Sequence, residues 1–500
     1  MALNTLGGTR PGTMGHMRVI VIGGGISGLA AALRLSSGGA SVTVLEGSAR
    51  VGGKLLTGSV AGSAAVDLGA ESMLARRPEG VDLAREAGLA EALGPPTAAS
   101  AAIWSRGEMC PMPKGHVMGV PGEPEALRGL LSDEGVARVG ADVSLPPTEV
   151  GEDVAIGEYV AERLGPEVVD RLVEPLLGGV YAGDAYRISM RAAVPQLYEA
   201  ARAGTSLLAG VRGLQQRAPA APCGSPVFMG IEGGVGRLPG AVADACRAAG
   251  AVIRTGTPVR TVRAHAAGEP SPPGTTAPAR WTVVTGSGET LGADALVLAV
   301  PAQQAARLLA DEAPAAAEGL SAVEYASMAL VTMAFRRADM EHVPGGSGFL
   351  VPPVDGRTIK ASTFSSNKWD WVAAQDPELF VLRTSVGRYG EEEVLEREDS
   401  ELVELSLRDL AAATGLSAAP VDRVVSRWNG ALPQYPVGHT ARVARIREAV
   451  ERVPGLALCG AAYEGVGIPA CIASGERAAR ETLAPAVAGS AREWAHDSCT

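Results

Sequence analysis

The first sixty residues show the hydrophobic pattern of a strand, a helix and a second strand. Residues 18–23 form a short run of β-branched residues that ends in glycines, as expected for a buried parallel strand. Residues 26–36 carry leucine and alanine at helical spacing, and residues 41–45 are strand-like again. This order predicts a βαβ unit of about thirty residues.

Strand-helix patterns return far along the chain. Residues 294–300 form an apolar strand pattern followed by Pro301 and a helical stretch to residue 309, and residues 456–460 precede a helical pattern over 472–483. A chain that returns in this way predicts one parallel sheet built from discontinuous segments.

The segments between these units carry mixed patterns. Helices are predicted at 78–93, 151–177, 232–249 (after a loop) and 391–414, where Gly415 is placed to end the last one; strands are predicted at 251–262, 280–285, 328–335 and 380–387; and 266–279 is predicted as an exposed, mobile loop. The fold class is therefore α/β, with a Rossmann-like, discontinuous dinucleotide-binding domain (residues 17–75, 226–325 and 426–485), a mainly helical insertion (76–225), a mixed-sheet substrate-binding part (326–425), and flexible tails (1–16 and 486–500).

Composition and charge narrow the function classes. Aromatic residues make up only 4% of the 500 residues, so the core is expected to consist mainly of Val, Leu, Ile and Ala. The formal charge of −11 argues against a nucleic-acid partner but leaves room for an acidic substrate in a local basic pocket, and for loose membrane contact. No apolar run is long enough for a transmembrane helix, and residues 1–15 lack the apolar region of a signal peptide. We therefore expect a cytoplasmic protein, with peripheral membrane association as the alternative.

Six cysteines without a CxxC pair indicate reduced thiols, and the scattered histidines predict no metal site.

Residues 23–28, Gly-Gly-Gly-Ile-Ser-Gly, satisfy the GxGxxG motif between a strand and a helix. Gly23 allows the tight turn, Gly25 lets the backbone approach a pyrophosphate, and Gly28 allows close packing of helix and strand. Glu46, at the end of the next strand, is placed to accept ribose hydroxyls. The alternative is a glycine-rich turn without function, which the combination of strand, helix and acid disfavours.

Further segments indicate which dinucleotide binds. The segment Arg50-Val-Gly-Gly-Lys54 is similar to an Arg-x-Gly-Gly-Arg/Lys segment of amine oxidase superfamily flavoproteins, which NAD enzymes generally lack. Residues 67–72, Asp-Leu-Gly-Ala-Glu-Ser, resemble that superfamily's loop at the flavin ring. The segments 174–184, 428–439 and 464–472 then resemble, in order, motifs of the protoporphyrinogen oxidase family, which includes the coproporphyrinogen III oxidases of Gram-positive bacteria. The resemblance extends from Arg18 to Leu483.

The resemblance implies an FAD-dependent oxidase that removes six electrons from a porphyrinogen in haem biosynthesis, with O2 as acceptor and hydrogen peroxide as product. Gly69-Ala70-Glu71 favours the coproporphyrinogen III branch, because eukaryotic members carry a base where this chain has Glu71. Protoporphyrinogen IX is the alternative substrate, and a homodimer is plausible only by resemblance. The cofactor-binding residues implied are Gly23, Gly24, Gly25, Ile26, Ser27, Gly28, Glu46, Gly47, Arg50, Gly53, Lys54, Gly69, Ala70, Glu71, Ser72, Val259, Trp428, Gly460, Val466, Gly467 and Ile468.

No catalytic side chain stands out, so the catalytic residues are left unknown. His439 titrates near neutrality, but an isolated loop histidine is more often structural. Glu174 and Asp184 are read as part of a shaped turn rather than as a catalytic pair. A surface role is favoured for each of the cations considered as propionate partners, which are Arg187, Arg191, Lys360 and Lys368.

Two other readings remain open. An amine oxidase or a carotenoid desaturase shares the superfamily fold, although amine oxidases usually need an aromatic cage that this aromatic-poor chain does not suggest. A non-catalytic binding protein of the same fold, like the GDP-dissociation inhibitors, is the alternative from a different class. The complete phosphate loop with Glu46 argues against it.

Overall fold

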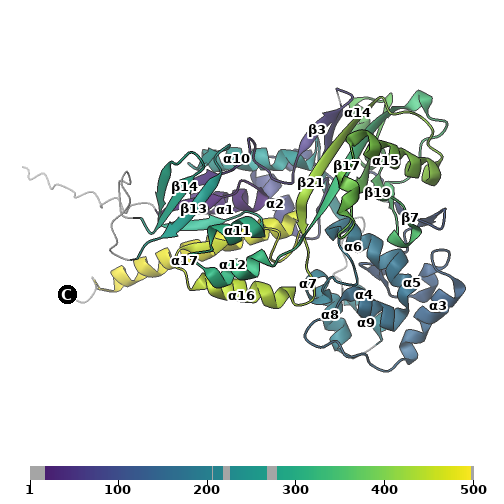
Figure 1. The fold of residues 1–500 in the computed structure, drawn as a ribbon, viewed down its shortest axis with the longest axis horizontal. Coiled ribbons are helices and arrows are strands. Elements are labelled where there is room, and N and C mark those ends of the chain that lie inside the picture. Colours follow the sequence, from purple (N-terminus) through teal and green to yellow (C-terminus); the bar gives the residue numbers. More distant parts are fainter. Residues whose placement is uncertain are drawn as a thin grey trace, which may run out of the picture.

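The computed structural model describes residues 17–496, apart from Ser63, Ala99, Thr205, 218–225 and 267–278. Residues 1–16, the last four residues and almost all of the loop expected at 266–279 therefore lie outside the described residues. Three parts lie around a common centre: a sheet covered by helices on the left of Figure 1, a second sheet at the upper right, and a group of helices at the lower right.

The first sheet is parallel and confirms the predicted return of the chain to one sheet. Its strands lie in the order β12 (Val252–Arg254), β2 (Ser41–Leu45), β1 (Arg18–Ile22), β16 (Ala295–Leu298) and β22 (Leu456–Leu458). All neighbouring pairs are parallel, and the central strands are buried on both faces, which explains their continuous apolar sequences.

Helices cover both faces of this sheet. On one face pack α1 (Ile26–Ser37), α10 (Leu238–Ala248) and α17 (Ile468–His496), whose apolar residues share a core with the sheet. The other face is covered by three helices and a small antiparallel sheet. The helices are α11 (Ala302–Leu308), α12 (Pro314–Ser321) and α16 (His439–Glu451), and the sheet consists of β13 (Val259–Ala264), β14 (Trp281–Thr285) and β15 (Thr290–Ala293). The fully buried Trp281 lies in this second core.

The second sheet has seven strands in the order β21 (Asp422–Pro433), β17 (Tyr325–Arg336), β20 (Leu379–Val386), β19 (Ile359–Thr363), β18 (Gly348–Leu350), β7 (Ala101–Ser105) and β8 (Glu108–Pro111). Only β18 and β7 pair in parallel. Helix α15 (Asp399–Thr414) packs against this sheet and ends at Gly415, which has φ +74°, as predicted. The helix starts at Asp399 rather than at residue 391, because Glu398 and Glu401 form a capping box there.

Two features of this sheet differ from the predicted boundaries. Strand β21, which carries Trp428, pairs with β17, although residues from 426 were assigned to the dinucleotide-binding domain. Strands β7 and β8 come from the insertion expected to be mainly helical, and they extend the second sheet. The pattern along a strand identifies its buried face but not the edge with which it pairs, so long-range pairing decided both cases.

The helical part forms its own core and lies below the second sheet in Figure 1. It contains α3 (Asp133–Gly140), α4 (Ile156–Leu164), α5 (Pro166–Val168), α6 (Glu174–Tyr181), α7 (Met190–Ala193), α8 (Pro195–Arg202) and α9 (Leu207–Arg217). The helix predicted at 151–177 is interrupted at Gly165, which has φ +95°, and a π-helical turn (Val169–Val173) precedes α6.

Short elements complete the described chain. They are β3 (Thr57–Val60), β4 (Ala64–Asp67), β5 (Met73–Leu74), α2 (Pro78–Glu86), β6 (Leu93–Gly94), β9 (His116–Val117), β10 (Val120–Pro121), β11 (Phe228–Ile231), α13 (Ser365–Lys368) and α14 (Asp370–Gln375). None of the helices in the described residues is both long and apolar enough to cross a bilayer.

Candidate functional site

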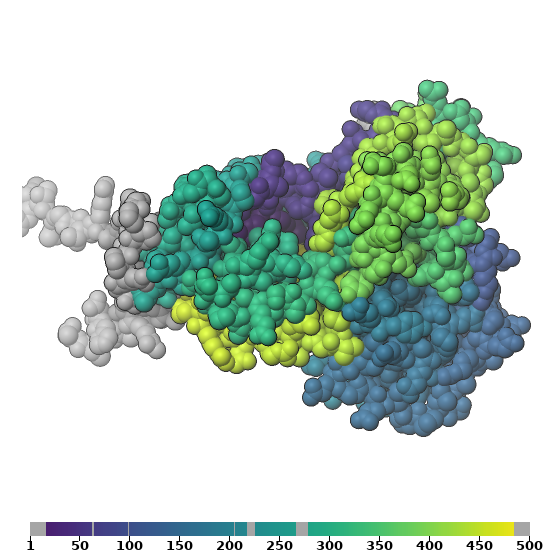
Figure 2. All heavy atoms as spheres, viewed as in Figure 1, coloured from purple at the N-terminus to yellow at the C-terminus, as the bar shows by residue number. Residues whose placement is uncertain are grey.

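A large cavity is lined by residues of both sheets and of helix α6. Its volume is about 1070 Å³, above the roughly 300–1000 Å³ of pockets that hold a single drug-sized ligand. One end is lined by the loop after β1 and by Glu46, and the other by strands β17, β19 and β20 of the second sheet. In Figure 2 the first described residues, in purple, are visible in the hollow between the teal elements of the dinucleotide-binding part and the second sheet.

The glycine-rich loop has the geometry that its sequence predicted. A Cβ at Gly23 would lie 2.4 Å from the Ala299 carbonyl oxygen, and one at Gly28 would lie 2.0 Å from the Gly23 carbonyl oxygen, so both positions require glycine. A Cβ at Gly25, by contrast, would meet nothing within 4 Å. Gly25 lines the cavity at the N-terminus of α1, which leaves open space where a pyrophosphate would meet backbone N–H groups and the positive end of the helix dipole.

Glu46 is held in place by the backbone. Its carboxylate accepts hydrogen bonds from the N–H groups of Gly24 (2.7 Å) and Ser48 (2.8 Å) at the end of β2. The side chain lines the cavity beside Gly47, Ser48 and Val259. An acceptor in this position suits the ribose hydroxyls of a dinucleotide.

Arg50 organises the segment 50–54 from outside the cavity. Its guanidinium donates to the carbonyl oxygens of Val51 (3.1 Å), Gly53 (2.6 Å) and Leu55 (3.1 Å), which closes the loop on itself. The loop is further held against the glycine-rich turn by a hydrogen bond from Gly52 N–H to the Gly24 carbonyl (2.8 Å).

Gly53 and Lys54 therefore line the cavity, while Arg50 does not. Burial lowers the pKa of Lys54, whose amine lies 5.8 Å from the centre of the Tyr325 ring.

The N-terminus of helix α17 points into the cavity, where Val466, Gly467 and Ile468 line it. The helix begins at Ile468 rather than at the predicted Ile472, because Pro469 is tolerated in a first turn, where its missing N–H is not needed. The helix also continues to His496, past the predicted boundary of the C-terminal tail.

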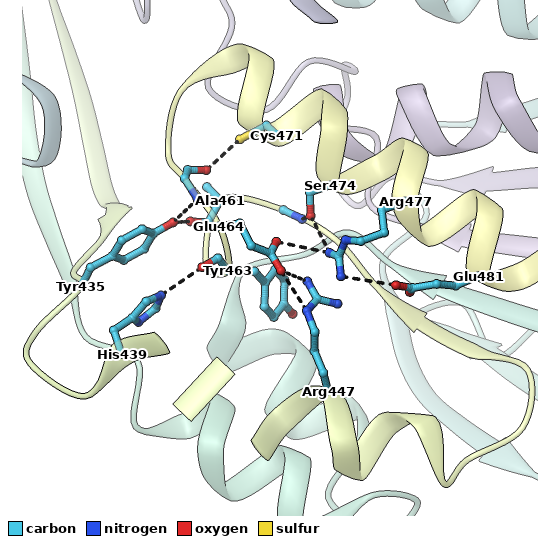
Figure 3. Close-up of polar contacts among 12 residues, drawn as sticks. Tyr435, His439, Arg447, Ala461, Tyr463, Glu464, Cys471, Ser474, Arg477 and Glu481 are labelled. Atoms are coloured by element: carbon cyan, nitrogen blue, oxygen red, sulfur yellow. Dashed lines mark hydrogen bonds and ion pairs between the residues drawn. The ribbon is translucent and has the colours of Figure 1, made fainter. Parts of the chain in front are cut away.

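A polar network behind this helix end fixes the loop 460–467 (Figure 3). Glu464 accepts from Arg447 (2.8 Å) and Arg477 (3.2 Å) on one side of the loop. On the other side, the Tyr435 hydroxyl donates to the Ala461 carbonyl and accepts from the Gly465 N–H (2.9 Å). The loop is thus held from both sides, and Gly460 and Gly467 line the cavity without side chains.

His439 belongs to this supporting network and does not line the cavity. Its ring stacks on Tyr435, with 3.9 Å between the ring centres, and its Nε2 lies 3.1 Å from the Tyr463 carbonyl. Burial lowers the pKa of His439 to about 4, so the ring is neutral at physiological pH. The structural reading of this histidine is favoured by its position.

Glu71 forms a buried ion cluster instead of lining the cavity. It pairs with Lys368 and with Arg383 (Nη2, 3.0 Å), and Arg383 also donates to the Gly69 carbonyl (2.7 Å). Burial alone would raise the pKa of Glu71, but the two cations hold it below its usual value. Arg383 lines the cavity and ties β20 to the loop 67–72, so Gly69, Ala70 and Ser72 are presented to the cavity.

Most of the residues predicted to bind the cofactor meet at this cavity. Those that do not line it are Gly24, Gly28, Arg50 and Glu71, which instead shape the turn, the helix packing and the two loops. Trp428 lines the cavity and is fixed by a hydrogen bond from its indole N–H to the Leu68 carbonyl (2.9 Å).

The residues considered for acid–base or propionate roles lie in different environments in the structure. Glu174 accepts from the Ala185 N–H (2.6 Å), which supports the shaped-turn reading, and burial raises its pKa to about 7. Arg187 is half-exposed and pairs with Glu324, as a surface residue does. Lys360, for which a surface role was favoured, is buried and lines the cavity, so that expectation was wrong.

Arg383 was not among the site residues predicted from the sequence. It lies within an ordinary alternating strand, and no local signal marks it. Only the pairing of β20 with its neighbours places it at the cavity. Among the described residues, no group of histidine, cysteine and acidic side chains is placed to hold a metal ion.

The chain shares its sequence pattern and its fold with known proteins. Residues 26–483 match the family of flavin-containing amine oxidoreductases. The chain belongs to the flavin-containing amine oxidoreductase family. The predicted flavin cofactor and the predicted FAD-binding α/β fold are thereby confirmed, and the match covers residues 26–28 of the glycine-rich loop and the whole loop before α17.

Within this flavin-containing family, three similar proteins are informative. The coproporphyrinogen III oxidase of Mycobacterium leprae is 38% identical over 92% of this chain and 96% of its own length. The protoporphyrinogen oxidase of Macaca fascicularis is 30% identical over 93% and 98%. A solved structure from Exiguobacterium sp. 255-15, provisionally described as a protoporphyrinogen oxidase, is 32% identical, with a TM-score of 0.79 over 94% of this chain and 99% of that one.

Proposed function

We propose that this protein is an FAD-dependent oxidase that converts coproporphyrinogen III to coproporphyrin III, with O2 as electron acceptor and hydrogen peroxide as product. The coproporphyrinogen III oxidases among its relatives support this substrate, since the M. leprae protein shares more identity with the chain than the macaque protoporphyrinogen oxidase does. We place the enzyme in the cytoplasm, and a homodimer remains an expectation from the family.

The observation that carries the proposal is the charge of the cavity. Its lining includes five cationic side chains and one carboxylate, although the whole chain has a net charge of −11. The cations are Lys54, Arg260, Arg307, Lys360 and Arg383, and the carboxylate is Glu46. This distribution suits two anionic occupants, a dinucleotide pyrophosphate and a substrate that carries four carboxylates.

The apolar part of the lining suits the macrocycle. Val180 of α6 and Leu350, Met328 and Leu330 of the second sheet face the same space, so a flat apolar ring would lie between the helix and the sheet. Tyr325 and Trp428 are the aromatic residues of the described lining.

When bound, FAD would supply the two-electron chemistry of each of three steps, by taking a hydride (two electrons and one proton) from a bridging carbon of the porphyrinogen while a pyrrole N–H loses a proton. The residues of the chain would supply orientation and an enclosed site. The glycine-rich loop and Glu46 would hold the dinucleotide end of the cofactor. The N-terminus of α17, with Val466 and Gly467, would place partial positive charge beside the ring system, where it favours the reduced, negatively charged cofactor. The described lining has no histidine and only one carboxylate, Glu46, at the far end of the cavity.

The test is an anaerobic titration of the purified protein, with its bound flavin, by coproporphyrinogen III. The proposal predicts loss of the visible flavin absorbance under argon, followed on admission of air by recovery of that absorbance, porphyrin fluorescence and hydrogen peroxide. A flavin that stays oxidised in the presence of excess coproporphyrinogen III would overturn the proposal. Free FAD at the same concentration is the control for direct chemical oxidation.

A further inference from the structure

Lys360 occupies an irregular position in strand β19. In the pairing with β20, Ile359 lies opposite Val386 and Ala361 lies opposite Ser385, so Lys360 is an extra residue without a partner in the ladder. Such a β-bulge changes the direction of the side chains on either side of it.

The bulge brings Lys360 to the cavity. Ile359 packs into the core beneath α15, whereas Lys360, Ala361 and Thr363 line the cavity. In a regular strand, Lys360 and Ala361 would face opposite sides of the sheet. The irregularity therefore places a lysine on the cavity side of a sheet without turning its apolar neighbour away from the core.

The amine of Lys360 is buried, with few polar neighbours. The residue is 6% exposed, and its Nζ donates to the Gly387 carbonyl (2.8 Å) and lies 4.0 Å from the Met328 sulfur. Met328 lines the same cavity. Burial, together with the nearby Arg388, lowers the pKa of Lys360 to about 7.

The charged groups of the neighbouring elements are engaged elsewhere. Asp409 of α15 accepts from the backbone N–H groups of residues 358 (2.8 Å) and 359 (3.0 Å). Glu391 lies 3.5 Å from Arg388, and Glu174 of α6 is bonded to a backbone N–H. Arg383, on β20, is a cation and pairs with Glu71. A buried amine at a cavity wall without an ion-pair partner among the described residues is a position that an anionic ligand would complete.

We propose that Lys360 is a substrate-binding residue that forms an ion pair with one propionate carboxylate of the porphyrinogen. The inference rests on the proposed function and deepens it, because it names a group that holds the substrate. The carboxylate would supply the counter-charge that the neighbouring elements do not provide. Binding would then draw one proton from solvent to the amine whenever the pH is above its free pKa.

The test uses binding of the oxidised product, so that it does not depend on turnover. Coproporphyrin III and its tetramethyl ester are titrated against the flavin-loaded wild type and the Lys360→Met variant, and binding is followed by quenching of porphyrin fluorescence. Methionine keeps an unbranched side chain that is one atom shorter, and it removes the charge. Arg187→Met is the matched control, since Arg187 is a half-exposed cation outside the cavity.

We expect Lys360→Met to bind coproporphyrin III about 10- to 100-fold more weakly, because a charge-assisted hydrogen bond is lost, and to bind the ester as the wild type does. Arg187→Met should bind both ligands as the wild type does. The flavin content and thermal unfolding of each variant show whether it has folded.

The wild type provides a second readout that needs no variant. At pH 8 in weak buffer, an indicator dye should report uptake of about one proton for each coproporphyrin III bound, and no uptake for the ester. The Lys360→Met variant should show no uptake with either ligand.

Failure of the proposed role of Lys360 can be distinguished from failure of the proposed function. Equal loss of affinity for acid and ester, unchanged affinity for both, or binding of the acid without proton uptake would overturn the role of Lys360 while leaving the proposed function intact. A wild type that neither binds coproporphyrin III nor is reduced by coproporphyrinogen III would overturn the proposed function, and the role of Lys360 with it.

Discussion

Substitution of Glu71 by glutamine should destabilise the protein by leaving two cations without their counter-ion. Glu71 keeps 7% of its side chain exposed, and Lys368 and Arg383 keep 17% and 13%. Removing one partner of a buried ion pair costs about 3–5 kcal/mol. Arg383 retains its bonds to backbone carbonyls and Lys368 reaches some solvent, so we expect the lower end, about 3 kcal/mol.

The expected shift in melting temperature follows from the length of the chain. Unfolding entropy is about 2.1 cal/mol/K per residue, so a chain of 500 residues gains roughly 1 kcal/mol/K. A loss of about 3 kcal/mol then lowers the melting temperature by about 3 °C if the chain unfolds as one unit. The assay is thermal unfolding of the flavin-loaded protein at pH 7.5, followed by circular dichroism and by flavin release.

The pH dependence gives a second check on this ion cluster. The pKa of Glu71 is held below its ordinary value, so its contribution is fully present at neutral pH and is lost as the pH falls through that lowered pKa. The difference between wild type and Glu71→Gln should therefore vanish in acid.

The control is Asp244→Asn, whose partner Arg247 lies on the surface and whose own side chain is 78% exposed. That variant should shift the melting temperature by less than about 0.5 °C. A Glu71→Gln variant as stable as the wild type at pH 7.5 would refute the reasoning.

Three further substitutions test the roles of Gly25 in cofactor binding, of Gly28 in folding and of His439 in structural support. Gly25→Val should fold normally and lose bound flavin, because its side chain enters open space at the phosphate loop. Gly28→Ala should fail to fold, because its Cβ would lie 2.0 Å from a carbonyl oxygen. Flavin absorbance per protein and circular dichroism distinguish the two variants, and full flavin content in Gly25→Val would contradict the assignment. The pKa of His439 falls from 6.5 to about 4 on folding, so wild-type stability should decline between pH 6.5 and pH 4 by up to about 3 kcal/mol. His439→Gln should flatten that decline without altering the pH profile of kcat/KM; a lost limb in that profile would show a catalytic role instead.

The parts of the site that the sequence predicted are local ones. Gly23 to Gly28, Glu46 and the loop before α17 act through contiguous backbone, so the spacing of glycines and an acid after a strand is enough to identify them. The same local signals predicted the parallel sheet, because three of its strands, β1, β16 and β22, are each followed by a helix.

The parts that the sequence did not predict depend on contacts between distant segments. Lys360 faces the cavity because β19 has a bulge, and Arg383 reaches the loop 67–72 because β20 lies beside β19 and β17. Glu71 occurs within a recognised motif, yet its partner Lys368 lies 297 residues away along the chain. No periodicity within one segment specifies such pairings.

Arg50 and His439 show a related limit. Both occur in segments that resemble functional motifs, but Arg50 binds the carbonyls of its own loop and His439 stacks behind the site. A motif identifies a segment, while the direction in which each side chain points depends on the packing around it.

The central claim is the oxidation of coproporphyrinogen III, and steady-state turnover tests it most directly. Purified flavin-loaded protein is given coproporphyrinogen III or protoporphyrinogen IX in air, and porphyrin fluorescence and hydrogen peroxide are measured together. The account predicts a higher kcat/KM for coproporphyrinogen III, with three hydrogen peroxide molecules formed for each coproporphyrin III, as a six-electron oxidation in two-electron steps requires. A higher kcat/KM for protoporphyrinogen IX, or porphyrin formation without hydrogen peroxide, would contradict it.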